Sequence, residues 1–427
     1  MKETIIPFCK EIPDNWTTIP NKYLFEYHSK KVGSEWNKYQ LLSLTTAGVK
    51  EKDINASGGK IPESYDKYQT VEPGDMIFCL FDLDVSAVFS GLSHKFGMIT
   101  SAYDVVRPND LKLNQSYSDY WFRYVFSNRY YKMYSKNIRY TITSEMFKSV
   151  HTPIPPIDVQ EKIGIFLNDK MSEIESLTTI ENQQIEKLKE YKQAIITEII
   201  LKGLDKNAPM KDSGVKWIGM VPESYNMMKM GWLANYKKGP FGSSLKISMF
   251  VPKGPNTYKV YEQKNAIYKD ETLGYYYIPK EKFEELSSNE VLPGDIIVSC
   301  AGTIGECFQM PNTMEPGIIN QALMRVRLNE GIIPQYYLYL FDAVISKESQ
   351  SSSNGSAMKN IPPFDVLKNI RVFIPSKDNQ IKVVNYLDQK CKEIDALISI
   401  KQKKIDDLDE YKKSLIYEYV TGKKEVC

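Results

Sequence analysis

Positively charged side chains alternate with tyrosines in the segment RYVFSNRYYKMYSKNIRY, residues 123–140. Guanidinium and ammonium groups at this density can neutralise phosphates, and the tyrosines can pack or donate hydrogen bonds. Lysines also stand beside small residues in HSKK (28–31) and KKGPFGSSLK (237–246), where glycine permits close approach to the backbone. The stretch SKESQSSSNGSAMKN (346–360) adds hydroxyl, amide and ammonium groups. Together these segments favour contacts with the phosphates and base edges of nucleic acid, although each alone is compatible with a solvated surface loop.

The candidate nucleic-acid contacts are the cations, hydroxyls and amide of these four segments. They are Lys30, Lys31, Arg123, Arg129, Lys132, Lys136, Arg139, Lys237, Lys238, Ser243, Ser244, Lys246, Ser352, Ser353, Asn354, Ser356 and Lys359. The formal net charge of the whole chain is only +2. A strongly basic chain would have argued for nucleic acid by itself, so here the prediction depends on the local segments.

The sequence patterns of common catalytic sites are missing. There is no GxxxxGK[ST] phosphate loop, no G-x-G-x-x-G and no G-x-S-x-G nucleophile elbow. NIPPF (360–364) resembles the Asn/Asp-Pro-Pro-Tyr/Phe motif of adenine methyltransferases, but Ile361 stands where a polar residue is needed, and we interpret it as a proline turn leading into a strand. GTIG (302–305) matches a G-x-x-G backbone clamp, and a tight turn explains it better. We therefore predict no catalytic residues in this chain.

The six cysteines and three histidines do not form a metal-binding pattern. No C-x-x-C pair is present, and His28, His94 and His151 lie far from the cysteines in sequence. We therefore predict free thiols and no metal site.

The composition is that of a soluble globular protein. The 427 residues suffice for two or three domains, and hydrophobic and charged residues make up 42% and 25% of the chain. The longest strongly apolar window, residues 76–89, is too short to span a bilayer and contains Asp82 and Asp84. The N-terminal segment lacks the apolar run of a signal peptide. These features predict no membrane association and a cytoplasmic location.

The chain contains a long internal repeat. Residues 155–200 align without gaps on residues 375–420, at an offset of 220 residues. At the same offset VEPGDMI falls on VLPGDII, and near the N-terminus the offset relaxes to 209, where IPDNW meets VPESY. This period is far longer than those of solenoid proteins. The sequence is therefore a tandem duplication, in which a globular segment and a helical segment each occur twice.

The helical segment of each repeat is predicted to be one long helix. Leucine and isoleucine recur every seven residues over about four heptads, with further large residues on an intervening row, as in coiled coils. The residues expected to pair are Leu167, Ile174, Leu177, Glu181, Leu188, Tyr191 and Ile195 in the first helix and Leu387, Ile394, Leu397, Lys401, Leu408, Tyr411 and Leu415 in the second. Prolines precede both helices, and Gly203 and Gly422 stand where the helices should end.

The two helices are expected to pack against each other, because neither can bury its apolar stripe alone. Each would be a rod of roughly 60–68 Å at 1.5 Å per residue. Two repeats related by a pseudo-twofold axis would make the helices antiparallel, so that their middles meet. Glu181 and Lys401 interrupt the apolar row near the two middles. We hypothesise that they form a pair of opposite charges, the alternative being that both are merely solvated.

The globular segments are predicted to be mixed α/β. The apolar runs DMIFCLF and DIIVSCAG each follow a Pro-Gly-Asp turn in the manner of strands, the aspartate being their first residue. Residues 117–128 and 334–345 form matching amphipathic helices in this prediction. Residues 211–221 are expected to be a polar connector between the first long helix and the second globular segment. The predicted fold is thus α+β, with two globular domains joined by two long antiparallel helices.

The duplicated order of elements resembles the specificity subunits of type I restriction–modification systems. In each repeat a globular unit is followed by a helix with P-x-x-D-x-Q at its start and L-x-E-Y-K towards its end. The strings YEQKNAIY, LPGDIIVSCAGTIGE and GIINQALMRVRL of the second unit and CLFDLDVSAVFSGLSHKFGMITSAYDVVRP of the first add to the resemblance, which covers essentially the whole chain.

The resemblance implies how the chain is divided into domains and what each part does. Residues 1–152 would be one target recognition domain, 153–204 a central helix, 205–375 a linker with the second target recognition domain, and 376–427 a C-terminal helix. Each domain would read one block of a split sequence in double-stranded DNA. The helices would set the spacer between the blocks and dock two methyltransferase subunits. This chain would be non-catalytic and would hold no cofactor.

The partners would supply the chemistry that this resemblance implies. The methyltransferase subunits would carry S-adenosylmethionine and modify adenine N6, and a restriction and translocase subunit would use ATP and magnesium. From the sequence alone two other functions stay open, a coiled-coil scaffold without DNA readout and a self-contained base-modifying enzyme.

Overall fold

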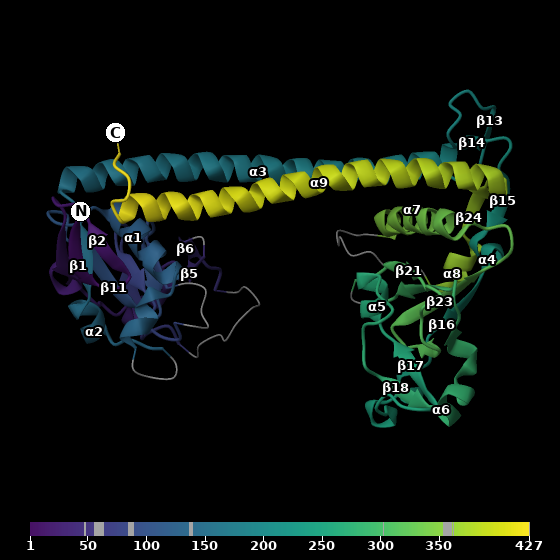
Figure 1. Cartoon of the computed structure of the whole chain (residues 1–427), viewed down its shortest axis with the longest axis horizontal. Coiled ribbons are helices and arrows are strands. Elements are labelled where there is room, and N and C mark those ends of the chain that lie inside the picture. Colours follow the sequence, from purple (N-terminus) through teal and green to yellow (C-terminus); the bar gives the residue numbers. More distant parts are fainter. Residues whose placement is uncertain are drawn as a thin grey trace. The chain divides into compact units, whose positions relative to one another are not determined.

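The computed structural model describes most of the chain as two compact units. The described residues are 1–46, 48–54, 64–83, 89–135, 140–301, 303–352, 361 and 363–426, with the side chains of 346–352 outside the description. The first unit comprises Met1–Gln183 and Lys401–Cys427, and the second comprises Gln184–Ile400. Each unit therefore holds one globular domain together with part of both long helices, α3 (Ile157–Lys202) and α9 (Lys377–Val420) (Figure 1).

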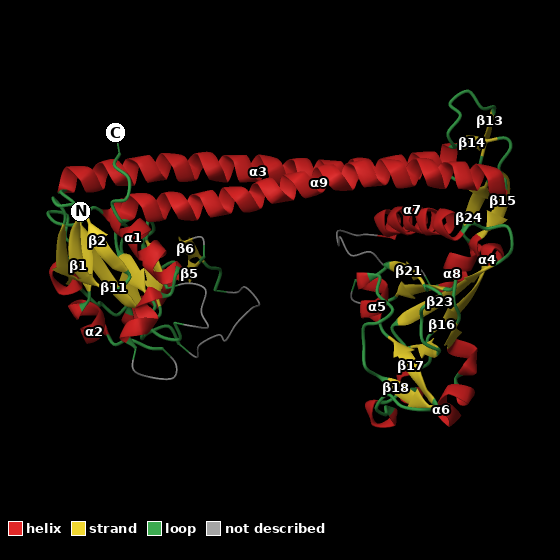
Figure 2. Ribbon diagram, viewed as in Figure 1, coloured by secondary structure: helices red, strands yellow, loops and turns green. Residues whose placement is uncertain are grey.

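The first domain is built on an antiparallel sheet in the order β4-β11-β8-β9. Figure 2 shows the strands of this domain in yellow and its helices in red. Antiparallel ladders β1-β2, β3-β12, β5-β6 and β7-β10 complete it. The strands are β1 (Lys2–Ile6), β2 (Cys9–Ile12), β3 (Thr17–Pro20), β4 (Phe25–Tyr27), β5 (Leu42–Thr45), β6 (Gly48–Glu51), β7 (Gln69–Val71), β8 (Met76–Phe78), β9 (Ser90–Leu92), β10 (Gly97–Ile99), β11 (Asp104–Pro108) and β12 (His151–Ile154). The helices are α1 (Gln115–Ser127) and α2 (Ser144–Ser149).

The second domain repeats this plan with the sheet β16-β23-β20-β21, the ladders β13-β14 and β15-β24, and a sheet β18-β17-β22-β19. The strands are β13 (Met210–Asp212), β14 (Met220–Pro222), β15 (Asn226–Lys229), β16 (Ala234–Lys238), β17 (Thr257–Tyr261), β18 (Tyr277–Pro279), β19 (Glu290–Val291), β20 (Ile296–Ser299), β21 (Cys307–Gln309), β22 (Gly317–Ile319), β23 (Leu323–Leu328) and β24 (Arg371–Ile374). The helices are α4 (Met230–Leu233), α5 (Gln263–Tyr268), α6 (Lys280–Glu285), α7 (Pro334–Ser352) and α8 (Phe364–Asn369). The predicted mixed fold and its duplication are confirmed.

The two predicted amphipathic helices are α1 and α7, and each packs on its own sheet. Asn114 caps α1 by accepting a hydrogen bond from the Tyr117 backbone N–H at 3.1 Å. Trp121 and Phe122 of α1 are fully buried, as are Tyr337 and Phe341 of α7. These aromatic side chains fill the cores because a helix on a twisted sheet needs a wide apolar face.

The aspartates of the two Pro-Gly-Asp turns make equivalent contacts in the two domains. The Asp75 side chain accepts the Glu72 backbone N–H at 2.7 Å and pairs with Arg107 Nε at 2.7 Å. In the second domain Asp295 accepts the Leu292 N–H at 2.8 Å and pairs twice with Arg327, at 2.7 Å. Each aspartate thus closes its own turn and ties it to the neighbouring strand.

A buried glutamine joins each domain to the start of its following helix. Gln160 accepts the Asn114 N–H at 2.8 Å and donates to the carbonyls of Lys112 and Pro155, at 3.0 and 2.9 Å. Gln380 makes the same set of bonds, accepting from the N–H of Ile333 at 2.9 Å and donating at 3.1 Å to the carbonyl oxygens of Gly331 and Pro375. The last residue of the P-x-x-D-x-Q motif is therefore a clamp between domain and helix.

Residues 211–221, predicted to be a connector, belong instead to the β13-β14 hairpin that opens the second domain. The β1-β2 hairpin takes the same place in the first domain. Lys211 Nζ donates to the carbonyls of Glu223 and Tyr225, at 2.7 and 2.8 Å. Lys2 Nζ does the same to Asp14 at 2.7 Å. The hairpin was missed because its strands are short and polar, and a hairpin of this kind is stabilised by the domain onto which it folds.

Within the first unit, α3 and α9 run antiparallel. Glu175 of α3 lies 3.6 Å from Lys412 of α9, and Glu181, further along α3, meets Lys401 and Lys404, which come earlier in α9. The distances from the Glu181 carboxylate are 3.1 Å to Lys401 and 2.5 Å to Lys404. Hydrogen bonds from Lys404 and then Lys401 lower the pKa of Glu181 from its usual value of 4.5.

Within the second unit, the remaining parts of the two helices pair in the same way. Lys192 of α3 bonds Asp395 of α9 at 2.7 Å. Gly203, with φ +74°, follows the end of α3, as expected for a helix C-terminus.

The apolar seam of both helices differs from the predicted one in its second row. The sevenfold row is buried or half-buried, but Leu177, Tyr191, Leu397 and Tyr411 are between 42% and 58% exposed. The inward row lies four residues after the sevenfold row, not three. Its members are Met171, Thr178, Ile185, Lys192, Ile199, Cys391, Ile398, Ile405, Lys412 and Tyr419. The sequence pattern did not indicate this row because it contains threonine and lysine. The large apolar residues on the outer face suggested a seam there instead.

Candidate nucleic-acid interface

A basic groove lies at the end of strand β16 in the second domain. The predicted contacts Lys237, Lys238 and Ser244 line it together. The other lining residues are Tyr236, Gly239, Pro240, Phe241, Gly242, Asn289, Gln321, Phe364 and Lys368. Ser243 and Lys246 are exposed on the same loop. Among the described residues no carboxylate lies within ion-pair distance of Lys237, Lys238 or Lys246, so these cations are available to phosphates.

Gly239 holds the loop of this groove against the neighbouring chain segment. A Cβ on Gly239 would lie 1.8 Å from the carbonyl oxygen of Asn320, so no other residue fits without movement. Its N–H donates to the Leu323 carbonyl at 2.9 Å. The Asn289 side chain donates to the Lys238 carbonyl at 2.9 Å, and the Ser244 N–H closes a turn onto Phe241 at 2.8 Å. The lysines and serine are therefore presented from a fixed backbone.

Two polar groups of the groove escaped sequence reasoning. Gln321 follows β22, and its side chain is exposed beside Gly239. Lys368 comes from α8, and its Nζ lies 5.3 Å from the ring centroid of Phe364. A glutamine amide can pair with an adenine edge, and a lysine can meet phosphate or guanine. The only signal in the sequence was Gly239. A glycine can indicate that two segments approach closely, but it does not identify the second segment.

The first domain carries Lys30 and Lys31 shortly after its own edge strand. At the offset of 209 residues they correspond to Gly239 and Pro240, whereas Lys237 and Lys238 correspond to His28 and Ser29. Strand β4, which precedes them, pairs with β11 as β16 pairs with β23. Both lysines are exposed, and the Lys30 carbonyl accepts the N–H of Thr70 at 2.8 Å. Both domains therefore present lysines near the end of the equivalent edge strand, Lys237 and Lys238 within the strand and Lys30 and Lys31 after it.

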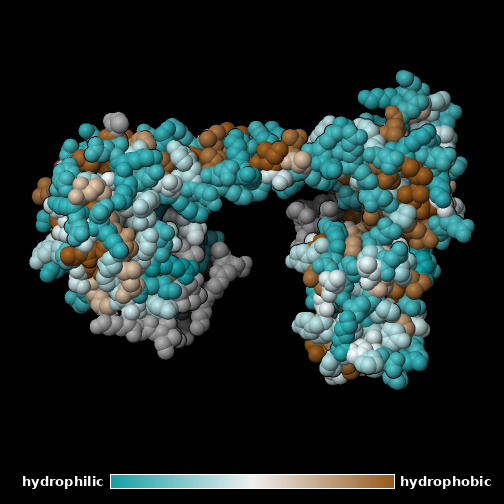
Figure 3. All heavy atoms as spheres, in the orientation of Figure 1, coloured by the Kyte–Doolittle hydropathy of each residue, from teal (hydrophilic) through white to brown (hydrophobic). Residues whose placement is uncertain are grey.

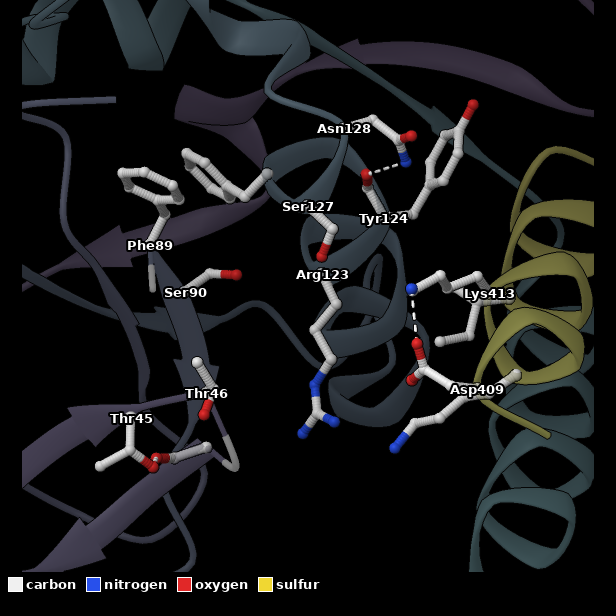
Figure 4. Close-up of a pocket in the computed structure, with 14 residues that line it drawn as sticks. Thr45, Thr46, Phe89, Ser90, Arg123, Tyr124, Ser127, Asn128, Asp409 and Lys413 are labelled. Atoms are coloured by element: carbon white, nitrogen blue, oxygen red, sulfur yellow. Dashed lines mark hydrogen bonds and ion pairs between the residues drawn. The ribbon is translucent and has the colours of Figure 1, made fainter. Parts of the chain in front are cut away.

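Arg123 lies elsewhere in the first domain, in a pocket of about 250 Å³. It forms an ion pair with Asp119 at 2.7 Å, and Lys413 and Asp409 of α9 face it across the pocket (Figure 4). The hydroxyls of Ser90 and Ser127 also line this space. Arg123 thus lies in a pocket between α1 and α9, apart from the lysines after β4.

Of the remaining candidates the structure describes only some. Arg129 is exposed in a left-handed conformation with φ 55°, and Lys132 Nζ lies 4.0 Å from the ring centroid of Tyr140. Ser352 is the last residue of α7. The candidates outside the described residues are Lys136, Arg139, Ser353, Asn354, Ser356 and Lys359.

Comparisons with known proteins agree with this architecture. Residues 222–421 match the family model described as type I restriction modification DNA specificity domain. The chain is 23% identical over 430 residues, covering 97% of this chain and 94% of the other, to the putative type I restriction enzyme MjaX specificity subunit of Methanocaldococcus jannaschii. Residues 222–421 thus match a DNA specificity domain of type I restriction–modification systems, and nearly the whole chain is similar to a specificity subunit.

Further similarities cover from 64% to all of the other chain. The MjaVIII specificity subunit of the same organism is 24% identical over 287 residues, 66% of this chain and 64% of that protein. The HsdS subunit from Thermoanaerobacter tengcongensis gives a TM-score of 0.54 at 14% identity, over 99% and 100% of the two chains. A chain from a structure on assembly and conformational transition of the type I R-M system gives 0.71 at 14% identity, over 97% and 100%. These solved structures support the fold.

The matching family model describes a DNA specificity domain, which supports a role in DNA sequence recognition. The two weak catalytic motifs have structural explanations where they are described. Pro363 and Phe364 of NIPPF begin helix α8, not the strand that was expected, since β24 starts only at Arg371. Gly305 of GTIG, with φ 86°, donates its N–H to Ser299 in the β20-β21 turn, as predicted. Asn360, Pro362 and Gly302 lie outside the described residues.

The described residues contain no group of three or more histidine, cysteine, aspartate or glutamate side chains that could hold a metal ion. Burial raises the pKa of the Cys9 and Cys79 thiols to about 11. Within the described part of the chain, no helix combines the length and the apolar character that crossing a membrane requires.

Proposed function

We propose that each domain of this specificity subunit reads one block of a bipartite DNA site, with the loops after β4 and β16 as reading surfaces. One observation carries the proposal. The two domains share a sheet order, and each presents lysines near the end of the equivalent edge strand. Lys237 and Lys238 would position the duplex through phosphates, while Gln321 and Ser244 would contact base edges.

The paired helices would set the spacer between the two blocks. Helix α3 is continuous over 46 residues and contributes to both units. A helix of this length is about 69 Å long, and its antiparallel partner stiffens it. Two reading domains bound to one duplex must meet grooves on the same face, which favours block centres about one helical turn apart.

Exchanging one domain tests this division of labour. Residues 1–152 would be replaced by the corresponding domain of another specificity subunit, and methylated adenines would be mapped in cells that also carry the partner subunits. We expect one half of the methylated motif to change while the other half and the spacer stay the same. A change in both halves, or in neither, would contradict the assignment of one block to each domain.

The outer faces of the helices are proposed to dock two copies of a methyltransferase subunit. Large apolar side chains are exposed there at the repeat offset, as hydrophobic surface on the helices in Figure 3 illustrates. In the first unit they are Leu177, Ile180 and Tyr411, and in the second Leu397, Ile400 and Tyr191. Their exposed fractions range from 42% to 65%. Exposed apolar patches of this kind mark protein contacts, and two matched patches fit two identical partners.

The docking proposal predicts a change in stoichiometry. The double substitution Leu177→Glu and Ile180→Glu should remove one partner copy and leave the other, as measured by mass determination of the purified complex. Gln183→Glu, at an exposed polar position of the same helix, is the matched control. Retention of both copies by the double variant would refute the patch.

The partners, and not this chain, are proposed to hold S-adenosylmethionine and, where restriction occurs, ATP and magnesium. Incubation of the pure specificity subunit with S-adenosylmethionine and DNA should therefore give no methyl transfer. Methyl transfer by the lone chain would favour the alternative of a self-contained enzyme.

A further inference from the structure

Phe241 is a large apolar side chain held out into solvent at the basic groove of the second domain. It is 86% exposed, although aromatic side chains of this size usually contribute to cores. It stands between Pro240 and Gly242 on the loop that Gly239 fixes against Asn320. The exposed ring of Phe241 therefore lies on a loop whose backbone is held in place.

The surroundings of Phe241 are those of a polyanion site and not of an apolar protein contact. Lys237 and Lys238 line the same groove, and neither has a carboxylate partner among the described residues. Gln321 and Ser244 supply groups that can bond base edges. Further along the same segment Ile247 is 79% exposed, so a second apolar tip follows the serines and Lys246.

The residue at the equivalent position of the first domain is buried. At the offset of 209 residues Phe241 corresponds to Val32, which is only 7% exposed. Val32 packs in a small core with Leu41, Tyr65 and Met98. The exposed aromatic tip is thus a property of the second domain, at a loop position where the first domain needs its residue for stability.

We propose that Phe241 is a wedge that inserts at a base step of the half-site read by the second domain. This inference rests on the proposed function and assigns one side chain a role within it. Phenylalanine, leucine and isoleucine inserted between base pairs unstack the step and bend the duplex, while neighbouring lysines hold the flanking phosphates. The base then stacks on the ring, and the sequence preference comes from how readily that step opens. The first domain, with Val32 buried, reads its half-site without such distortion.

The test uses full-length protein, assembled with the partner subunits, and duplexes carrying the mapped methylation site. 2-Aminopurine is placed at successive steps of each half-site, and its fluorescence reports unstacking. The wild type should raise the signal at one step of the second half-site and at none of the first. Phe241→Ala should abolish this rise and weaken binding about 5- to 150-fold, the range expected for one lost base–aromatic stack. Phe241→Trp should retain both.

The controls separate this inference from the proposed function. Lys237→Ala with Lys238→Ala should reduce the dependence of affinity on salt but keep the fluorescence rise at saturating protein. Phe241→Ala should leave the salt dependence and the thermal unfolding midpoint unchanged, because its ring touches mainly solvent. Unchanged affinity and fluorescence in Phe241→Ala would overturn the wedge and leave DNA reading intact. Loss of a partner subunit from Phe241→Ala would also overturn it, and absence of sequence-specific binding by the wild type would overturn both proposals.

Discussion

Replacing Gln160 by leucine should loosen the first domain from its helix. The Gln160 side chain is 1% exposed and uses its whole amide, accepting from the Asn114 N–H and donating to the Lys112 and Pro155 carbonyls. Leucine has a similar volume, so the space stays filled while all three bonds are lost. The change therefore isolates the hydrogen bonds of the clamp.

The expected cost follows from the groups left without partners. A buried backbone donor or acceptor without a hydrogen bond costs roughly 1–3 kcal/mol. Three groups are affected, and the two carbonyls can recover part of the loss through water. We therefore expect the free energy of local opening at this junction to fall by about 2–4 kcal/mol. At about 1.4 kcal/mol per factor of ten, this corresponds to roughly 30- to 700-fold faster amide exchange.

Native-state hydrogen exchange measures this opening at the Asn114 amide, which donates the bond. Gln183→Leu, an exposed glutamine on the same helix, is the matched control and should change nothing at Asn114. Gln380→Leu should accelerate exchange at the Ile333 amide in the second unit and spare the first. If Gln160→Leu and Gln183→Leu exchange alike at Asn114, the clamp carries none of the stability assigned to it.

Three further outcomes follow from the same geometry. Lys237→Ala with Lys238→Ala should lower the slope of log affinity against log salt by up to about 1.8, and an unchanged slope would mean that neither lysine meets phosphate. Gly239→Ala should weaken DNA binding by displacing the loop, since its Cβ would meet the Asn320 carbonyl, and equal weakening by Gly242→Ala, which has open space, would refute this. The pKa of Glu181 is lowered in the folded state, so its stabilisation is present above the unfolded pKa and is lost as pH falls through the lower folded value. In denaturation titrations the difference in stability between the wild type and Glu181→Gln should therefore shrink below about pH 4.5, and a difference that persists at lower pH would contradict the pairing with Lys401 and Lys404.

The frame of the molecule could be predicted because its signals are periodic or duplicated. A sevenfold row of leucine and isoleucine and two matching halves imply long paired helices. The pseudo-twofold relation of two repeats predicts that these helices run antiparallel, so that Glu181 and Lys401 meet at their middles. The second row was misplaced because outward Leu177 and Leu397 look like core residues. Inward Lys192 and Lys412 look like surface residues, but they are half-buried and pair with Asp395 and Glu175. Periodicity identifies a stripe, but it does not tell which of two adjacent stripes a partner will cover.

The groove could be predicted only in part because it is assembled across the chain. Lys237, Lys238 and the serines after them could be predicted because they lie in one continuous segment. Gln321 and Lys368 come from separate elements, and only the close packing of Gly239 on Asn320 brings Gln321 beside the loop. A single sequence contains no periodic signal for a contact of this kind.

The two domains differ most where the frame makes no demand on the side chain. The turn aspartates, the strand arginines and the clamp glutamines recur because each closes a specific set of hydrogen bonds. The side chain of Phe241 makes no such bond. The residue at this place can therefore differ between the domains: it is the exposed Phe241 in the second domain and the buried Val32 in the first. A fixed frame with replaceable loop residues would let one fold read two unlike half-sites, as proposed, because the loop side chains can change while the bonds that hold the loops in place remain.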